Sequence, residues 1–297
     1  MSADADAQEL LAVRFEEHRS HLRAVGYRML GSVAEAEDAV QETWIRLSRS
    51  DVSGVENLGG WLTTVAGRVC LDMLRSRSSR REDAMETYVP DPLVSVDDAA
   101  HPEYEAELAD SVGLALLVVL ETLPPAERLA FVLHDMFAVP FEDIAPIVDR
   151  SPATARQLAS RGRRKVQGRT LEHETDRSRQ REVVGAFLAA ARGGDFEALL
   201  TVLDPDVVMR ADTGGVGGAS RLVLGARAVA QQAEAFRSMA PFARMALVNG
   251  MPGVVTAPDG KAFSVMAFTV VDGLIVEINL LADPARLGAL DIPVVSD

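Results

Sequence analysis

The sequence contains few cysteines, lysines and histidines, and each shortage excludes a class of structure or site. Its 297 residues include one cysteine, Cys70, so no disulfide can form within the chain, and a reducing compartment is expected. One cysteine and five scattered histidines do not offer the ligand spacing of a metal cluster. We therefore expect no metal and no other cofactor.

Long apolar runs are also missing. The most apolar stretch is Val112–Leu120, far shorter than the roughly 20 residues that a membrane span needs. The first residues, MSADADAQEL, are acidic and lack the apolar core of a signal peptide. We expect a soluble, cytoplasmic protein without membrane contact.

Positive charge is scarce overall but concentrated locally. The net charge is −14, and lysine occurs only at Lys165 and Lys261. So acidic a chain does not coat nucleic acid indiscriminately. Screening, however, limits charge effects to roughly 8 Å, so a basic stripe on an acidic body can still meet phosphate. The stretch Ser151–Arg169, SPATARQLASRGRRKVQGR, is such a stripe.

The chain divides into segments of different pattern. Helical periodicity, interrupted by turn formers at Gly31–Ser32 and around Ser53–Gly60, marks a first segment. A Pro-containing acidic stretch then predicts an extended linker. Helical periodicity then returns. A last segment combines two short helices with β-like runs and a hairpin signal at Val271–Gly273, which predicts an α+β domain with a curved antiparallel sheet. The predicted boundaries are 8–81, 82–108, 109–170 and 178–297.

The basic stripe belongs to a pair of helices joined by a tight turn. The first helix is predicted over Phe141–Val148 and is broken at Asp149–Ser151. Ser151 is a good N-cap, and Pro152 fits the first helical position after it. Apolar residues from Ala155 onward recur at helical spacing, which leaves the arginines on the other face. This is the layout of a DNA-reading helix-turn-helix, and the alternative is a solvated basic face.

Two earlier helices carry less specific patterns. Glu35–Leu47 has an apolar face and a polar face, as any amphipathic surface helix has. The helix that follows it ends in an arginine cluster, Arg75–Arg81. Such a cluster suits the helix macrodipole as well as a phosphate backbone.

Two stretches resemble one family in order, spacing and length. GSVAEAEDAVQETWIRL with GGWLTTVAGRVCLDMLRSRSSRR resembles region 2 of the extracytoplasmic-function (ECF) sigma factors. LPPAERLAFVLHDMFAVPFEDIAPIVDRSPATARQLASRGRRKV resembles their region 4. The resemblance implies two all-α domains, binding to core RNA polymerase and promoter-directed transcription initiation.

The resemblance also implies roles for individual residues. The region 2 helix would grip the clamp of the largest polymerase subunit through Asp38, Gln41, Glu42 and Trp44. The −10 element would meet Asn57, Trp61, Thr64, Arg68, Asp72 and Arg75. The −35 element would meet Ser151, Ala153, Thr154, Arg156, Gln157, Ser160, Arg161, Arg164 and Lys165.

The last segment resembles the SnoaL-like branch of the NTF2-like cone fold, which a smaller group of ECF sigma factors carries after region 4. The linker motif YVPDPLV, the glycine-rich ADTGGVGG and the loop ADPARL resemble motifs of that group, with Thr213 where a glycine is typical. The resemblance implies a domain that regulates in cis and replaces a separate anti-sigma factor. Its contact residues would be Tyr88, Pro90, Asp91, Pro92, Asp212, Gly214, Gly215, Asp283, Pro284 and Arg286. The alternative for the glycines is a flexible loop between strands.

Three functions stay open on the sequence: a self-regulated sigma factor, a ligand-sensing helix-turn-helix regulator, and a cyclase or isomerase fused to a DNA-binding module. From Glu174 onward the chain has no His, Tyr, Trp or Cys. A lone carboxylate such as Asp212 then lacks a donor for a developing oxyanion, so we expect no enzyme. A pocket for a small apolar ligand inside the cone is a further open possibility. The residues that could line it are Met209, Met245, Met266, Phe236, Phe263 and Phe268.

Overall fold

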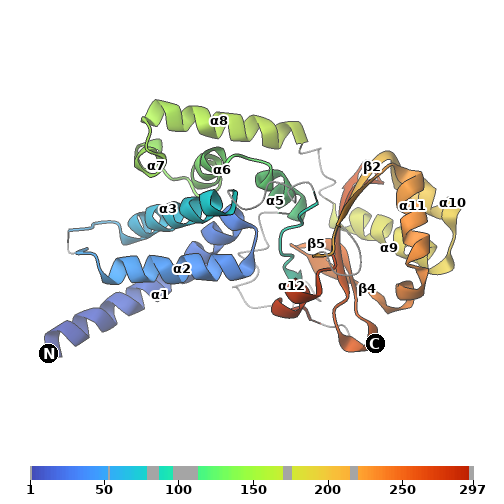
Figure 1. The fold of residues 1–297 in the computed structure, drawn as a ribbon, viewed down its shortest axis with the longest axis horizontal. Helices are drawn as coiled ribbons and strands as arrows, with labels where there is room; N and C mark the ends of the chain where they lie inside the picture. Colours follow the sequence, from blue (N-terminus) through green and yellow to red (C-terminus); the bar gives the residue numbers. More distant parts are fainter. Residues whose placement is uncertain are drawn as a thin grey trace. The chain divides into compact units, whose positions relative to one another are not determined.

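The computed structural model describes residues 2–52, 54–78, 87–95, 113–169, 176–214 and 220–293. The chain forms two compact units. The first unit contains Met1–Asp83 and Val119–Arg169, and the second contains Ala84–Val118 and Thr170–Asp297. Each unit is described by itself (Figure 1). Among the described residues, no helix combines the length and the apolar character that crossing a bilayer requires.

The first unit begins with three helices, α1 (Ser2–Leu30), α2 (Val33–Ser48) and α3 (Leu58–Ser78). The predicted break at Gly31–Ser32 is confirmed. Gly31 has a φ of 66°, which a side chain would disfavour. Ser32 caps α2 by accepting a hydrogen bond from the Glu35 amide.

The core of these three helices is apolar and tightly closed. Large side chains from all three helices are buried there, including Phe15, Leu22, Val40, Leu47 and Leu62. Cys70 of α3 is completely buried, and this desolvation raises the pKa of its thiol to about 12. Cys70 is therefore a packing residue.

The first unit continues with the predicted helix-turn-helix. After α5 (Leu114–Glu121) come α6 (Pro125–Phe131), the π-helical turn η1 (Val132–Met136), α7 (Phe141–Val148) and α8 (Pro152–Arg169). Asp149 ends α7 in the left-handed region with a φ of 56°. The Ser151 hydroxyl accepts a hydrogen bond from the Thr154 amide, which confirms the predicted cap of α8.

Close backbone packing fixes α8 on α6. Ala155 and Ala159 are fully buried on the inner face of α8. A Cβ atom added at Gly162 would lie 3.0 Å from the Phe131 Cβ and 3.2 Å from the Glu127 carbonyl oxygen. A larger residue at 162 would push α8 away, so this glycine sets how far the basic face projects.

Arginines connect the two helical groups of the first unit. Arg128 of α6 is 3% exposed and donates to the Met29 carbonyl oxygen of α1 at 2.9 Å. It also pairs with Glu121 at 2.7 Å. Arg77 of α3 approaches the same carboxylate at 3.6 Å. Charges this deeply buried are tolerated only when they are paired.

The second unit is a curved sheet with helices against it. Figure 1 shows α9 (Arg177–Gly193), α10 (Phe196–Val202) and α11 (Ala226–Ala235) beside the strands. The sheet order is β1-β4-β5-β6-β7-β2-β3. The strands are β1 (Val94–Ser95), β2 (Leu203–Asp212), β3 (Arg221–Leu224), β4 (Ala243–Val248), β5 (Met251–Thr256), β6 (Ser264–Val271) and β7 (Leu274–Leu281). Their pairings are antiparallel except for β2 with β7.

One strand of this sheet comes from the stretch predicted as a linker. β1 pairs with β4 through Val94 opposite Val248. Asn249 extends the pairing, since its amide donates to the Leu93 carbonyl and its side-chain oxygen accepts from the Leu93 amide. Residues 88–95, which are part of the stretch predicted as an extended linker, are therefore packed on the C-terminal sheet.

Most of the predicted strands and turns are present. The turn after β6 places Asp272 and Gly273 at φ values of 50° and 79°, as a two-residue hairpin requires. The helices α11 and α12 (Pro284–Ala289) were not predicted. Phe236 and Phe263, which were considered as lining of a possible cone pocket, are 49% and 42% exposed.

The core of the second unit lies between the helices and the sheet. Val184 and Phe187 of α9 and Val229 of α11 share it with Val254 and Ile278 of the sheet. Met209 and Phe268 also lie in this core, so they fill space between the two layers. The predicted fold class, two helical regions followed by an α+β cone, is confirmed.

Candidate functional site

The outer face of α2 carries the residues predicted to meet polymerase. Asp38 and Gln41 are exposed, whereas Glu42 and Trp44 are half-buried. The Trp44 ring packs on Phe15 of α1, with centroids 5.2 Å apart. Glu42 also forms an ion pair with Arg46, whose Nε donates to the carboxylate at 2.9 Å. The structure thus gathers the four residues along one helix, two of them fully open.

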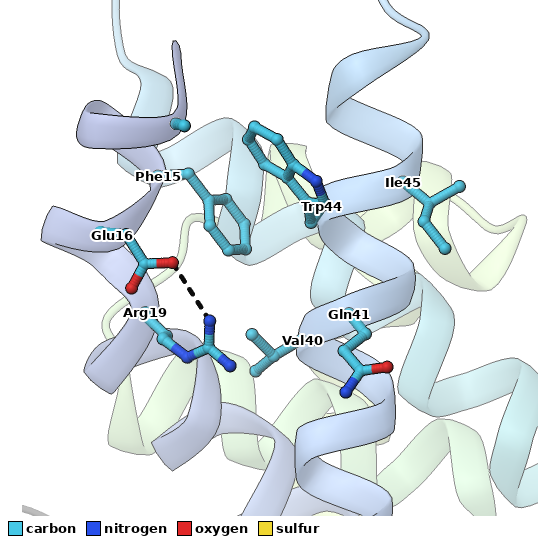
Figure 2. Close-up of a pocket in the computed structure, with 8 residues that line it drawn as sticks. Phe15, Glu16, Arg19, Val40, Gln41, Trp44 and Ile45 are labelled. Atoms are coloured by element: carbon cyan, nitrogen blue, oxygen red, sulfur yellow. Dashed lines mark hydrogen bonds and ion pairs between the residues drawn. The ribbon is translucent and has the colours of Figure 1, made fainter. Parts of the chain in front are cut away.

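A groove of about 310 Å³ runs between α1 and α2 beside that face. Figure 2 shows Phe15 and Trp44 facing each other across it, with Gln41 and Ile45 along α2. Its lining residues are Ala12, Phe15, Glu16, Arg19, Val40, Gln41, Trp44 and Ile45. Sequence reasoning missed the α1 side of this groove. The spacing of Phe15 with Arg19, and of Gln41 with Ile45, is the helical signal that could have indicated it.

The rim of the groove stays charged. Arg19 contacts Glu16 at 3.1 Å and Glu37 at 3.3 Å. Burial alone would lower the pKa of Arg19, but these two carboxylates outweigh it and raise the pKa above its ordinary value. The groove therefore combines an apolar floor with a fixed cation.

A second hollow of about 460 Å³ lies where α2 ends and α3 begins. Three residues predicted for the −10 element, Trp61, Thr64 and Arg68, line it. Arg46 and Arg49 at the end of α2 add cations to its wall, Ser50 also lines it, and none of the three was predicted. Their signal was an arginine pair just before the turn-forming stretch. An aromatic ring among arginines suits an unpaired nucleotide.

The other residues predicted for the −10 element lie around this hollow. Asn57 directly precedes α3, and its side-chain oxygen accepts a hydrogen bond from the Gly60 amide in the first turn. Asp72 lies 4.0 Å from Arg46. Arg75 is exposed on α3 outside the residues that line the hollow. Arg68 also donates to the Pro146 carbonyl of α7 at 3.2 Å, so this packing engages one predicted DNA contact.

The basic residues of α8 fall into two groups. Arg163 forms two hydrogen bonds to Asp135 of η1, and Lys165 pairs with Glu127 of α6 at 2.9 Å. Arg156 and Arg164 instead lie on the exposed face. The predicted −35 residues thus lie along α8, with Ser151 at its N-cap, and Lys165 is engaged by an acidic neighbour within the unit.

Arg286 of α12 joins the three motifs of the second unit. Its guanidinium binds Asp91 of the YVPDPLV stretch and donates to Asp212 of β2 at 2.8 Å. It also donates to the Val89 carbonyl at 2.7 Å. We call Arg286, Asp91 and Asp212 the linker clip. Asp91 is 6% and Asp212 7% exposed, so both carboxylates of the clip are buried, whereas Arg286 is half-buried.

The surrounding motif residues complete the linker clip. The Tyr88 ring lies 4.8 Å from the Arg286 guanidinium carbon. Burial alone would lower the pKa of Arg286, but Tyr88 and the two aspartates outweigh it and raise the pKa. Asp283 caps α12, and Pro284 is its first residue. Pro90 and Pro92 are buried, Gly214 donates its amide to Asp212, and Gly215 lies outside the described residues.

The comparisons with known proteins agree with this arrangement. Residues 14–80 match Sigma-70 region 2, and residues 113–166 match Sigma-70 region 4. The chain is 39% identical over 289 residues to the ECF RNA polymerase sigma factor SigJ of Mycobacterium tuberculosis, covering 92% of this chain and 91% of that protein. This chain is an ECF sigma factor. The crystal structure of SigJ superposes with a TM-score of 0.77 at 36% identity, covering 95% of this chain and 100% of the other.

A second relative supports the same family. The probable ECF sigma factor SigI of M. tuberculosis is 37% identical over 278 residues, covering 92% of this chain and 93% of that protein. The chain is therefore an alternative sigma factor that directs transcription initiation. Among the described residues of this sigma factor, no cluster of three or more His, Cys, Asp or Glu could hold a metal ion.

Proposed function

We propose that this sigma factor docks on core RNA polymerase through the exposed face of α2 and the groove beside it. Asp38 and Gln41 offer polar contacts that need no rearrangement, because both side chains are exposed. The Phe15–Trp44 floor offers apolar surface that a helix of the polymerase clamp could cover. An interface with aromatic anchors and a polar rim is the usual composition of a specific protein contact.

We propose that α3 and α8 read the two promoter elements, −10 and −35. The observation that carries this proposal is that one compact unit exposes two arginine-bearing surfaces: the Trp61–Arg68 hollow and the outer face of α8. An indole beside arginines suits an unpaired strand. A recognition helix suits a duplex major groove. Polymerase would bind region 2 at its clamp and region 4 at its flap, and it would supply the remaining affinity for DNA. A protein of net charge −14 can therefore recognise a promoter as part of that complex.

We propose that the C-terminal domain regulates promoter recognition in cis, in the cytoplasm and without a separate anti-sigma factor. Its support is the linker clip together with the β1–β4 pairing, which bind residues 88–95 to the C-terminal sheet. The linker joins region 2 to region 4 in the sequence. A contact that holds the linker therefore limits which arrangements of the two regions polymerase can capture.

We propose that the C-terminal domain is not an enzyme. Asp212, the carboxylate considered as a base, accepts hydrogen bonds from Arg286, the Val89 amide and the Gly214 amide. Ser220 adds a further contact at 3.4 Å. Both of its oxygens are thus engaged, and a general base needs a free lone pair within reach of substrate.

Reconstituted transcription tests the polymerase and promoter roles. Purified protein with core polymerase is expected to give promoter-specific transcripts, whereas the protein alone binds promoter duplex weakly. Asp38→Arg and Gln41→Arg, on the exposed face, should weaken core binding by about tenfold or more, because they disrupt interface complementarity. Glu182→Arg on α9 changes charge outside both regions and serves as the control. Absence of core binding by the unaltered protein would remove the proposal.

The full-length variant Asp91→Asn tests the regulatory role. It weakens the linker clip and leaves regions 2 and 4 unaltered. Transcription from one promoter should change by about fivefold or more, which is the usual range of coupling between sites. A chain cut after Arg169 should change activity in the same direction. Equal transcript yields from all three proteins would contradict regulation in cis.

A further inference from the structure

Region 4 contains a stack of side chains that has no role in the proposals above. Its members are Arg156 of α8, Phe141 of α7 and His134 of η1. The Arg156 guanidinium carbon lies 5.1 Å from the centroid of the Phe141 ring. The His134 ring stacks on Phe141 with centroids 3.8 Å apart and planes 27° apart. We call this set the Arg156 stack.

The base of the Arg156 stack is held by the protein interior. Phe141 is 8% exposed and begins α7. His134 Nδ1 lies 3.0 Å from the Val139 carbonyl oxygen. A carbonyl oxygen only accepts, so Nδ1 carries the hydrogen and the imidazole plane is fixed. A fixed imidazole in turn limits the orientation of the Phe141 ring.

The upper end of the stack is open. Arg156 is exposed and lies in the N-terminal half of α8, the half of a recognition helix that reaches base edges. A flexible arginine loses rotamer entropy when it binds. A guanidinium held over an aromatic ring has lost part of that freedom already. Its edge N–H groups remain available for the bidentate contact to guanine.

The other cations of α8 are placed differently. Arg163 and Lys165 pair with Asp135 and Glu127, and Arg161 lies 4.0 Å from Glu127. Arg164 donates to the Ser160 carbonyl of its own helix at 3.4 Å. All four lie in the C-terminal half of α8. Among the described residues of α8, Arg156 is the cation that combines the N-terminal half with an aromatic support.

We propose that Arg156 is the specificity-determining arginine of region 4 and that Phe141, steadied by His134, is its positioning residue. The ligand is a guanine-bearing base pair read in the major groove of the −35 duplex. This inference rests on the proposed promoter role of α8 and deepens it. Phe141 touches no base; it acts by fixing the angle at which Arg156 leaves the helix.

The test is a −35 selection with reconstituted holoenzyme. A promoter library randomised over the −35 element is transcribed, and the transcripts are counted by sequence. The unaltered protein should prefer guanine at one position by about tenfold, the value of one bidentate contact. Arg156→Ala should abolish that preference and leave the other positions unchanged. Arg156→Lys should also abolish it, because lysine keeps the charge but lacks the planar fork.

Phe141 variants separate positioning from folding. Phe141→Leu should reduce the preference at the Arg156 position to about threefold, since part of the bidentate geometry is lost. Phe141→Tyr keeps the ring and should retain the full preference. The double variant Arg156→Ala with Phe141→Leu should show no further loss at that position. Thermal unfolding of each variant identifies any that fail to fold.

Several results would overturn the inference. Arg156→Lys with an intact preference would do so even if Phe141→Leu does not fold, because Arg156 is exposed. If Phe141→Leu lowered transcription equally on all −35 sequences, Phe141 would be a structural residue and the positioning role would be wrong. Absence of promoter-specific transcripts from the unaltered holoenzyme would remove the proposed function itself, and this inference with it. Unchanged base preferences in the Arg156 and Phe141 variants, together with normal transcription, would overturn this inference and leave the proposed function intact.

Discussion

Arg156 and Arg164 in α8 are exposed, whereas Arg286 in α12 lies between Asp91 and Asp212, which are 6% and 7% exposed. The same side chain thus occurs in the two units with opposite surroundings. An exposed arginine keeps its hydrogen-bond donors for a ligand. The half-buried Arg286 uses them to balance two carboxylates that could not be buried alone. Exposure and the number of carboxylate neighbours therefore separate arginines that a ligand can reach from structural ones.

Replacing Arg286 gives the largest effect that this comparison predicts. Arg286→Met leaves Asp91 and Asp212 buried without a cation, which should cost about 3 kcal/mol of stability in the second unit. Hydrogen exchange of the β1 and β4 amides in the full chain measures it. Arg181→Met on the exposed face of α9 is the matched control, with an expected change below about 0.5 kcal/mol. Equal losses in both variants would show that burial does not distinguish these arginines.

Replacing Arg128 tests whether the stability contribution of an arginine depends on its burial or on the unit in which it lies. Arg128 belongs to region 4 but is 3% exposed and bonds Glu121 and the Met29 carbonyl. Arg128→Met should cost about 2 kcal/mol, the usual loss for hydrogen bonds to a charged group. Both tryptophans, Trp44 and Trp61, lie in the first unit, so their fluorescence reports its unfolding. The exposed Arg150→Met should leave that transition unchanged.

The sequence predicted elements whose signals are local. Ser151 and Pro152 predicted the start of α8, and Gly31 and Ser32 predicted the end of α1. The Val271–Gly273 turn predicted the hairpin between β6 and β7. Each of these signals uses residues within one or two helical turns or one hairpin. Their physical causes, capping and backbone conformation, act over the same short range.

The missed elements depend on partners far apart in the chain. β1 has only two residues, and it is a strand because Val94 pairs with Val248. α11 has ten residues between two strands, and its buried face consists of Val229 and Ala230, so it was too short to stand out as a separate helix. The pairing of Lys165 with Glu127 joins residues 38 positions apart. Nothing in the basic stretch shows that one of its cations already has a partner.

A DNA-binding comparison within α8 gives the next effect. Arg164→Ala should weaken holoenzyme binding to the −35 duplex by about 1–3 kcal/mol if Arg164 contacts guanine, and evenly on all sequences if it contacts phosphate. Lys165→Met should have a smaller effect, because Glu127 already neutralises that ammonium group. Fluorescence anisotropy with a labelled promoter duplex measures both. A larger loss for Lys165→Met would mean that the ion pair opens on DNA.

The smallest predicted effect comes from neutralising Glu127, the carboxylate that pairs with cations of α8. Glu127 lies 2.9 Å from Lys165 and 4.0 Å from Arg161. Glu127→Gln keeps the size of the side chain but removes the charge that competes with phosphate for these cations. One newly gained phosphate contact would steepen the salt dependence of duplex binding by about 0.9 in log K against log salt. Glu142→Gln, at the first turn of α7, changes the net charge equally but faces no α8 cation in an ion pair among the described contacts. A steeper slope in Glu127→Gln than in Glu142→Gln would show that the acidic neighbour withholds a DNA-binding cation, and equal slopes would assign the effect to net charge.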